Sequence, residues 1–142
     1  MTSPTVFRHR VRIYYEDTDH SGVVYHSNYL KYFERAREHV IGPEALVRLL
    51  EEDGIGFAVY KVEATYKRGV RFGDIIEVRT QVKKTSDYRL HFQQDIFYPH
   101  KNELLVAGRV DLVCIDREGA LVALPQHVVE ALETAVPGDV SY

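Results

Sequence analysis

Residues 14–37 read YYEDTDHSGVVYHSNYLKYFERAR, and this stretch predicts a strand end, an acidic turn and the start of a helix. Asp17 and Asp19 fall where the alternating pattern of a strand stops, and Ser21 followed by Gly22 is typical of a turn. After the turn, apolar residues recur every three or four positions, as on one face of a helix. We therefore expect carboxylates beside the N-terminus of a long helix.

The chain before this stretch predicts a strand with one buried face. Arginines alternate there with apolar residues, and His9 interrupts the pattern. The positions on the predicted buried face are Phe7, Val11, Ile13 and Tyr15. After the helix begins, its pattern pauses at Gly42-Pro43 and resumes over residues 44–52, because proline fits the first turn of a helix but not its interior.

Four alternating segments follow Gly56 and predict four more strands. Their apolar positions are Ala58, Tyr60, Val62, Ala64 and Tyr66, then Ile76, Val78 and Val82, then Tyr88, Leu90, Phe92, Ile96 and Tyr98, and finally Leu104, Val106, Val110, Leu112 and Cys114. Short connections favour antiparallel pairing, and residues 125–134 predict a short terminal helix. The sequence therefore predicts the α+β class, with one domain spanning residues 1–142.

The second predicted strand carries apolar residues on both faces at its start. Phe57 and Val59 alternate with Ala58 and Tyr60, so neither face is wholly polar. One long helix covers only part of a five-stranded sheet, and exposed sheet edges are commonly managed by pairing. We therefore expect a homodimer formed along this strand.

The composition is that of an ordinary globular protein. The 142 residues are 45% hydrophobic and 27% charged, and the net charge of −3 argues against a general nucleic-acid-binding protein. No apolar run approaches the roughly 20 residues that a transmembrane helix needs, and we find no signal-peptide pattern. A single cysteine allows no internal disulfide, which agrees with a cytoplasmic location.

Two metal-binding interpretations of the acidic turn fit the sequence poorly. The run DTDHSG, residues 17–22, matches the opening of an EF-hand loop, but Asn28 stands where that loop needs a bidentate glutamate. A transition-metal site through Asp17, Asp19, His20 and His26 has suitable ligands but lacks an i, i+4 helical pair and a cysteine. We therefore predict no metal site.

Two interpretations remain open on the residues alone. Asp17 and Asp19 can cap the turn and the helix, where open N–H groups and the helix dipole favour carboxylates. Alternatively, one of these carboxylates acts as a nucleophile or general base while backbone N–H groups stabilise a developing oxyanion. Thioesters suit the second arrangement, because a thiolate is a good leaving group.

The motifs of this stretch carry a resemblance to a known family. The segments YEDTD (residues 15–19), GVVYH (residues 22–26) and FERAR (residues 33–37), with Tyr29 between them, resemble the signature of the hotdog-fold acyl-CoA thioesterases. The closest group is the 4-hydroxybenzoyl-CoA thioesterase family, in particular its branch found with the Tol-Pal envelope system. The predicted order of elements agrees with this family along the whole chain.

The resemblance implies a five-stranded antiparallel sheet wrapped around the long helix, with dimers often paired into tetramers. It implies that Asp19 is the catalytic carboxylate and that the peptide N–H at His26 polarises the thioester carbonyl. The imidazole of His26 and the hydroxyl of Tyr15 match further motif positions, although Tyr15 also fits the buried face of the first strand. Asp17 is expected to hold the loop in place.

The resemblance further implies that coenzyme A is part of the substrate and that no separate cofactor is needed. Its phosphates would bind basic residues near the turns, and two clusters are candidates: Lys67, Arg68 and Arg71, and Lys83, Lys84 and Arg89. A structural position as a solvent-exposed charge at the edge of a strand explains the presence of each of these basic residues equally well. The alternative function is a catalytically weak hotdog protein that binds acyl carriers or envelope-biogenesis partners.

Two further residues are expected to be structural. Glu34 lies within the FERAR segment, where a salt bridge to Arg35, Arg37 or a neighbouring strand is the default for such a charge. Cys114 lies in an apolar run and is expected to be part of the core. Neither residue is therefore a candidate for chemistry.

Overall fold

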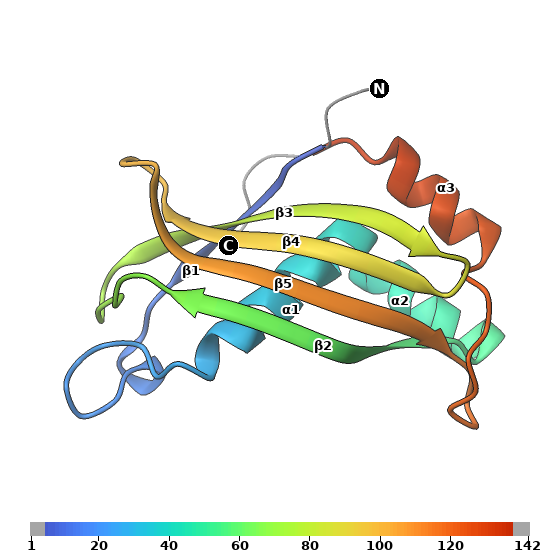
Figure 1. Cartoon of the computed structure of the whole chain (residues 1–142), viewed down its shortest axis with the longest axis horizontal. Helices are drawn as coiled ribbons and strands as arrows, with labels where there is room; N and C mark the ends of the chain where they lie inside the picture. Colours follow the sequence, from blue (N-terminus) through green and yellow to red (C-terminus); the bar gives the residue numbers. More distant parts are fainter. Residues whose placement is uncertain (1–4, 138–142) are drawn as a thin grey trace.

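The computed structural model describes residues 5–137 and contains a five-stranded antiparallel sheet in the order β1-β3-β4-β5-β2. The strands are β1 (Phe7–Arg12), β2 (Gly56–Tyr66), β3 (Ile75–Ser86), β4 (Arg89–Tyr98) and β5 (Glu103–Ile115). The helical elements are η1 (Tyr15–Asp17), α1 (Asn28–Ile41), α2 (Pro43–Arg48), η2 (Leu49–Asp53) and α3 (Gln126–Thr134). Figure 1 shows α1 lying along one face of the sheet. This is the α+β architecture that the sequence predicts.

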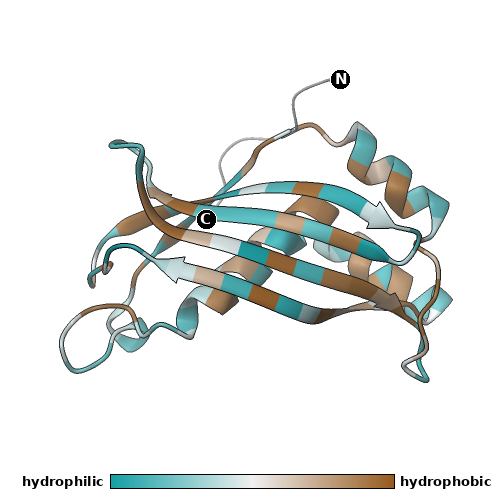
Figure 2. Ribbon diagram, viewed as in Figure 1, coloured by the Kyte–Doolittle hydropathy of each residue, from teal (hydrophilic) through white to brown (hydrophobic). Residues whose placement is uncertain are grey.

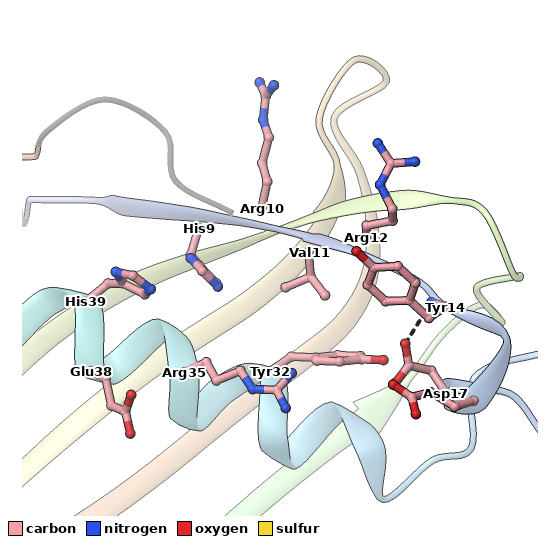
Figure 3. Close-up of a pocket in the computed structure, with 11 residues that line it drawn as sticks. His9, Arg10, Val11, Arg12, Tyr14, Asp17, Tyr32, Arg35, Glu38 and His39 are labelled. Carbon is pink, nitrogen blue, oxygen red and sulfur yellow. Dashed lines mark hydrogen bonds between the residues drawn. The ribbon is translucent and has the colours of Figure 1, made fainter. Parts of the chain in front are cut away.

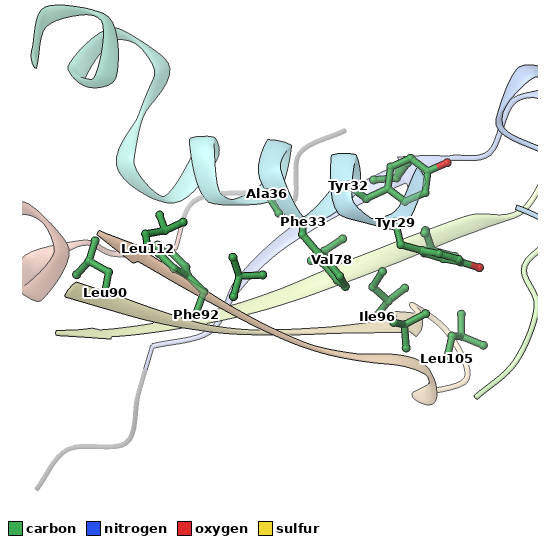
Figure 4. Packing of buried hydrophobic residues seen from close by; sticks show 14 of the residues in the cluster. Tyr29, Tyr32, Phe33, Ala36, Val78, Leu90, Phe92, Ile96, Leu105 and Leu112 are labelled. Atoms are coloured by element: carbon green, nitrogen blue, oxygen red, sulfur yellow. The ribbon is translucent and has the colours of Figure 1, made fainter. Parts of the chain in front are cut away.

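The core forms where α1 meets the sheet. Tyr29, Phe33 and Ala36 lie on the buried face of α1, and Figure 4 shows them directed at Val78 and Ile96. All of these side chains are at most 2% exposed. Figure 2 shows the corresponding alternation of apolar and polar residues along the strands. Full burial of one large apolar side chain contributes about 1.5–3 kcal/mol, so this layer is a main source of stability. Cys114 is buried within the same cluster, as expected.

The break between the two helices lies at the predicted position. Gly42 has φ 99° and ψ 124°, a conformation that disfavours any residue with a Cβ, and Pro43 is the first residue of α2. The chain therefore turns at Gly42 without a proline inside α1.

The sheet passes very close to α1 at Gly108. A Cβ built on Gly108 would lie 2.6 Å from Cζ of Phe33 and 2.5 Å from the carbonyl oxygen of Gln94. Both distances are far below van der Waals contact, so only glycine fits at this point of β5. The close approach lets the ring of Phe33 rest directly on the strand.

A β-bulge in β2 corrects the predicted faces of that strand. The register with β5 pairs Val59 with Leu112 and Lys61 with Asp111, so Tyr60 is an extra residue without a partner. The bulge reverses the alternation after Val59. The apolar residues before the bulge and those after it therefore lie on the same face of β2, the face toward α1. Uninterrupted alternation predicted that these two groups lie on opposite faces.

A buried polar network lies beneath α1, and alternation alone did not reveal it. Gln94 is fully buried on the inward face of β4, and its Nε2 donates to the carbonyl of Phe33 at 2.9 Å and to Oγ1 of Thr80 at 3.1 Å. Nη1 of Arg37 donates to Oε1 of Gln94 at 2.9 Å. Every polar group of the Gln94 amide thus has a partner, which makes its burial tolerable.

Glu77 is also buried, although it lies on the face of β3 predicted to be polar. Its carboxylate is 1% exposed and forms ion pairs with Arg8 at 3.6 Å, Arg10 at 3.3 Å and Arg79 at 2.9 Å. Arg79 in turn covers the ring of Phe97 at 4.1 Å. The long arginine side chains bury Glu77, because their stems pack over it while their charges pair with it.

Candidate active site

The acidic loop, residues 17–24, folds as a miniature hairpin in front of α1. Asp19 N–H donates to the carbonyl of Val23 at 2.8 Å, and Thr18 forms a β-bridge with Val24. Gly22 has φ 84°, which allows the tight turn at the tip. Val24 N–H donates to the carbonyl of Val70 at 2.8 Å, so the loop is also attached to the segment between β2 and β3.

Asp19 is held in its ionised form by Ser21. Its Oδ1 accepts hydrogen bonds from the backbone N–H of Ser21 at 2.8 Å and from the hydroxyl of Ser21 at 2.5 Å. These two bonds, led by the one from the hydroxyl, lower the pKa of Asp19 below its ordinary value. The carboxylate is partly exposed and can therefore meet a substrate.

Asp17 ties the loop to the start of α1. Its Oδ2 accepts the N–H of Tyr14 at 2.8 Å, the dashed line in Figure 3. Its carbonyl oxygen accepts the N–H of Tyr25 at 3.0 Å and Nδ2 of Asn28 at 2.8 Å. The polar groups of Asp17 are thus used in the structure of the loop, as the sequence suggested.

The backbone N–H of His26 has no hydrogen-bond partner within residues 5–137. The carbonyl oxygen of His26 accepts a hydrogen bond from the hydroxyl of Tyr66 at 3.2 Å. The imidazole is exposed and lies 4.5 Å from the ring of Tyr25, centroid to centroid. In the described part of the chain the imidazole makes no hydrogen bond with Asp19. The free donor is therefore the backbone N–H of His26, directly before the N-cap Ser27 of α1.

Tyr15 does not lie on the buried face of the first strand. β1 ends at Arg12, and Tyr15 begins the 3-10 turn η1, where its side chain is 79% exposed. Its ring packs edge-to-face on Phe72, with centroids 5.7 Å apart. Among the described residues its hydroxyl forms no hydrogen bond with Asp19. The strand ends before this position, so the alternation that predicted burial does not extend to Tyr15.

The two basic clusters lie at opposite ends of the sheet. Arg71 forms a β-bridge with Val23 of the acidic loop, so the cluster of Lys67, Arg68 and Arg71 lies at the end of the sheet to which this loop is attached. Lys83 and Lys84 instead lie at the far end of β3, where they line a cavity with α3. Figure 1 shows the same separation. Arg89, in the second cluster, lies over the ring of Tyr60 at 5.2 Å. One protomer therefore brings only the first cluster to the loop.

Some members of these clusters have partners within the chain. Arg68 pairs with Glu103 at 2.9 Å, and Lys84 pairs with Asp87 at 3.5 Å. Both pairs are largely exposed, so they cost little to break when a phosphate binds.

Exposed aromatic side chains surround the acidic loop, and the sequence reasoning did not assign them to the site. Tyr66 is the most informative, because its hydroxyl binds the carbonyl of His26 and its ring lies 5.5 Å from that of Tyr29. The exposed members of this aromatic rim are Tyr15, Tyr25, Tyr66 and Phe72. The sequence indicates the role of these aromatic residues only weakly. Tyr66, for example, fits the pattern of a strand as one more apolar position.

A cavity of about 820 Å³ lies on the other side of the loop, between β1 and α1. Figure 3 shows Asp17 and Tyr32 at one end of it and the stacked rings of His9 and His39 at the other. Burial, with the charge of Asp17, raises the pKa of Tyr32. Asp19 and His26 do not line this cavity.

Among residues 5–137, no three side chains of His, Cys, Asp or Glu converge as metal ligands. The same residues include no helix long and apolar enough to cross a bilayer. The carboxylates of Asp17 and Asp19 are instead turned toward N–H and hydroxyl donors.

Comparison with known proteins assigns the family. Residues 13–132 match the model of the thioesterase-like superfamily. The chain belongs to this superfamily. It is 37% identical over 117 residues to the acyl-CoA thioester hydrolase YbgC of Escherichia coli O6:H1, a match covering 79% of this chain and 84% of the relative. It is 35% identical over 130 residues to the acyl-CoA thioesterase YbgC of Haemophilus influenzae, covering 88% and 93% respectively.

The fold agrees with the same family. The structure superposes on a 1,4-dihydroxy-2-naphthoyl-CoA thioesterase from Synechocystis with a TM-score of 0.84, at 23% identity, over 91% of this chain and 96% of that one. At this identity the similarity concerns the fold alone. The resemblance to hotdog thioesterases, and the prediction that this member of the superfamily is a thioester hydrolase, are confirmed.

Proposed function

We propose that this protein hydrolyses the thioester bond of acyl-CoA to a free carboxylic acid and coenzyme A, with Asp19 as nucleophile or general base. The observation that carries the proposal is that the loop before α1 holds both an Asp19 carboxylate bound by Ser21 and, in the described part of the chain, an unpaired backbone N–H at His26. The names of the YbgC relatives support acyl-CoA as the substrate class.

The reaction needs two functions from these groups. The N–H of His26 would donate to the thioester carbonyl and stabilise the oxyanion as the carbonyl carbon becomes tetrahedral. Asp19 would attack that carbon directly, or remove a proton from a water molecule that attacks it. The carbon–sulfur bond then breaks and the thiolate leaves with coenzyme A. If Asp19 attacks directly, water hydrolyses the resulting anhydride and restores the carboxylate.

The substrate would be held by groups around the loop. Lys67, Arg68 and Arg71 lie on the side of the loop where coenzyme A phosphates would enter, and their charge suits phosphate. The second cluster, Lys83, Lys84 and Arg89, would approach the same substrate only from another protomer. Tyr15 and the imidazole of His26 are exposed beside the loop and would contact the substrate directly.

A dimer formed along β2 would suit this arrangement. β2 is an edge strand, and its exposed apolar residues include Val59, Tyr60 and Val62. Antiparallel pairing of two such edges would place the start of one β2 beside the end of the other, close to the partner's acidic loop. We expect this dimer, or a tetramer of two such dimers, in a cytoplasmic protein.

The test is release of free coenzyme A from a panel of short aliphatic, long aliphatic and aromatic acyl-CoAs. Asp19→Asn should lower kcat/KM at least about 100-fold, the usual contribution of a general base or nucleophile. Asp53→Asn, which changes an exposed carboxylate at the end of η2, should retain the wild-type rate. Equal rates for wild type and Asp19→Asn would refute the catalytic assignment. No turnover by any protein would favour a binding function toward acyl carriers or envelope-biogenesis partners.

A further inference from the structure

The acidic loop and α1 meet at a short joint around His26. The loop is a hairpin, because the N–H of Asp19 donates to the carbonyl of Val23 and the N–H of Tyr25 donates to the carbonyl of Asp17. Asp19 therefore moves with the hairpin, whereas His26 lies between the hairpin and the helix. The position of the Asp19 carboxylate relative to the N–H of His26 thus depends on how the hairpin is fixed to α1.

Asn28, the first residue of α1, binds the hairpin through its side chain. Nδ2 of Asn28 donates to the carbonyl oxygen of Asp17 at 2.8 Å, and its backbone N–H donates to the carbonyl of Tyr25 at 2.9 Å. Glu34, further along α1, is exposed and forms no ion pair among residues 5–137, contrary to the sequence expectation. Of these two polar side chains, Asn28 is the one that ties the helix to the loop.

The amide of Asn28 is not needed to satisfy the carbonyl of Asp17. This carbonyl already accepts the N–H of Tyr25 at 3.0 Å, so it would keep a partner without Asn28. The amide of Asn28 is only partly buried, so it could bind water instead. What the bond adds is a link between two elements, since it holds the start of α1 against the arm of the hairpin that carries Asp19. We therefore expect Asn28 to affect the geometry of the site more than the stability of the fold.

Few other side chains hold this joint. Ser27 is the N-cap of α1, but its side chain makes no capping hydrogen bond. The hydroxyl of Tyr66, at the end of β2, donates to the carbonyl of His26 at 3.2 Å. Asn28 thus holds the joint from the side of the hairpin, and Tyr66 holds it from the side of the sheet. A backbone N–H that stabilises an oxyanion must lie about 2.7–3.1 Å from it, so a small rotation at this joint would weaken that bond.

We propose that Asn28 is a positioning residue for thioester hydrolysis, and that its amide fixes the Asp19 carboxylate relative to the N–H of His26 by holding the carbonyl of Asp17. This inference rests on the proposed function, and Asn28 itself touches none of the reacting atoms. Asp19 and the N–H of His26 must act on one thioester group at the same time. An error of about 1 Å in the placement of such groups can cost about 100-fold in rate.

The kinetic test uses the acyl-CoA that the wild type hydrolyses fastest. Asn28→Ala should lower kcat about 10- to 100-fold and change KM less than about twofold, because the groups that bind coenzyme A are retained. Asn28→Asp keeps the shape of the side chain but has no N–H donor, so it should lose at least as much. Ser27→Ala changes the neighbouring residue and should keep the wild-type kcat. An unchanged kcat in Asn28→Ala would overturn the proposal, and so would a raised KM with an unchanged kcat.

The pH profile separates a positioning role from an electrostatic one. Asn28 makes no hydrogen bond with the Asp19 carboxylate in the described part of the chain. Asn28→Ala should therefore lower the plateau of the kcat/KM–pH profile and leave its acidic limb at the wild-type pH. A displaced limb in Asn28→Ala would show that Asn28 acts on the ionisation of Asp19, which would contradict the proposal.

Two further measurements exclude a purely structural role. Urea unfolding should show that Asn28→Ala is fully folded under the conditions of the assay. A loss of activity that only matches a loss of folded protein would overturn the proposal. In an Asp19→Asn background, Asn28→Ala should lower the remaining rate little further, because the amide acts through Asp19. Full multiplication of the two losses would contradict this route.

The outcomes also separate this proposal from the proposed function. If Asp19→Asn retains the wild-type rate, the proposed function fails and the role of Asn28 fails with it. If Asp19→Asn is inactive while Asn28→Ala keeps the wild-type kcat, the proposed function stands and only the role of Asn28 is refuted.

Discussion

Ser21 donates two hydrogen bonds to a single oxygen of Asp19, one from its backbone N–H at 2.8 Å and one from its hydroxyl at 2.5 Å. Both stabilise the charged carboxylate and lower its pKa. The hydroxyl bond can be removed by mutation, whereas the backbone bond cannot. This makes the ionisation of Asp19 open to a direct test.

Ser21→Ala should move the acidic limb of the kcat/KM–pH profile to higher pH. Without the hydroxyl, the carboxylate loses its strongest stabilising bond, so its pKa rises toward the ordinary value and protonation begins at a higher pH. The rate well above this pKa should change much less than the position of the limb. Ser27→Ala, beside the start of α1, serves as the control and should leave the limb in place. An unmoved limb in Ser21→Ala would show that another group governs it.

Gly108→Ala should destabilise the fold by about 1–3 kcal/mol, the usual cost of overpacking a core. The new methyl group would clash with Phe33 and with the backbone oxygen of Gln94, and the backbone cannot move aside cheaply. Urea unfolding measures the loss. Gly56→Ala is the matched control in β2, because a Cβ there meets no atom within 4 Å. Similar stability of the two variants would contradict the close approach of Phe33 to β5.

Gln94→Leu should destabilise the protein by about 2–3 kcal/mol, because it removes the only acceptor that residues 5–137 offer the buried guanidinium of Arg37. It also removes the side-chain donor to the carbonyl of Phe33. Gln93→Leu is the natural comparison, since Gln93 lies on the opposite face of β4 and donates to Asp95 at 2.9 Å in a partly exposed position. Its cost should stay below about 1 kcal/mol. Equal costs in thermal unfolding would argue against the importance of the buried network.

His9 should make the folded state sensitive to acid. Burial, followed by the charges of His39 and Arg35, lowers the pKa of His9 from 6.5 to about 4. The unfolded chain therefore binds a proton before the folded one does. As pH falls from about 6.5 to about 4, the free energy of unfolding should decrease by up to about 3 kcal/mol from this group.

Replacing the imidazole of His9 separates its contribution to stability from that of carboxylates that titrate in the same pH range. The loss of stability between pH 7 and pH 4 should be smaller in His9→Phe than in the wild type. His100→Phe changes an exposed histidine and should retain the wild-type loss. A wild-type pH dependence in His9→Phe would mean that His9 ionises normally in the folded protein.

Much of the architecture could be read directly from residue order. The period of two in the strands, the period of three to four in α1 and the break at Gly42 are local patterns, and each one specifies its element without reference to the rest of the chain. The short connections also specified antiparallel pairing. Asp19, Ser21 and Gly22 were recognisable as a turn because a turn is built from neighbouring residues.

Only the tertiary structure decided which side chains are buried, paired or brought together. The bulge at Tyr60 depends on how β2 pairs with β5, and it places Phe57 and Val59 on the same face of β2 as the apolar residues after the bulge. Burial of Gln94 depends on partners 14 to 61 residues away in the chain. The two basic clusters, which looked equivalent in the sequence, lie at opposite ends of the sheet. Local sequence patterns do not contain this information. The period of a pattern indicates the direction in which a side chain points, but not the residues that it contacts.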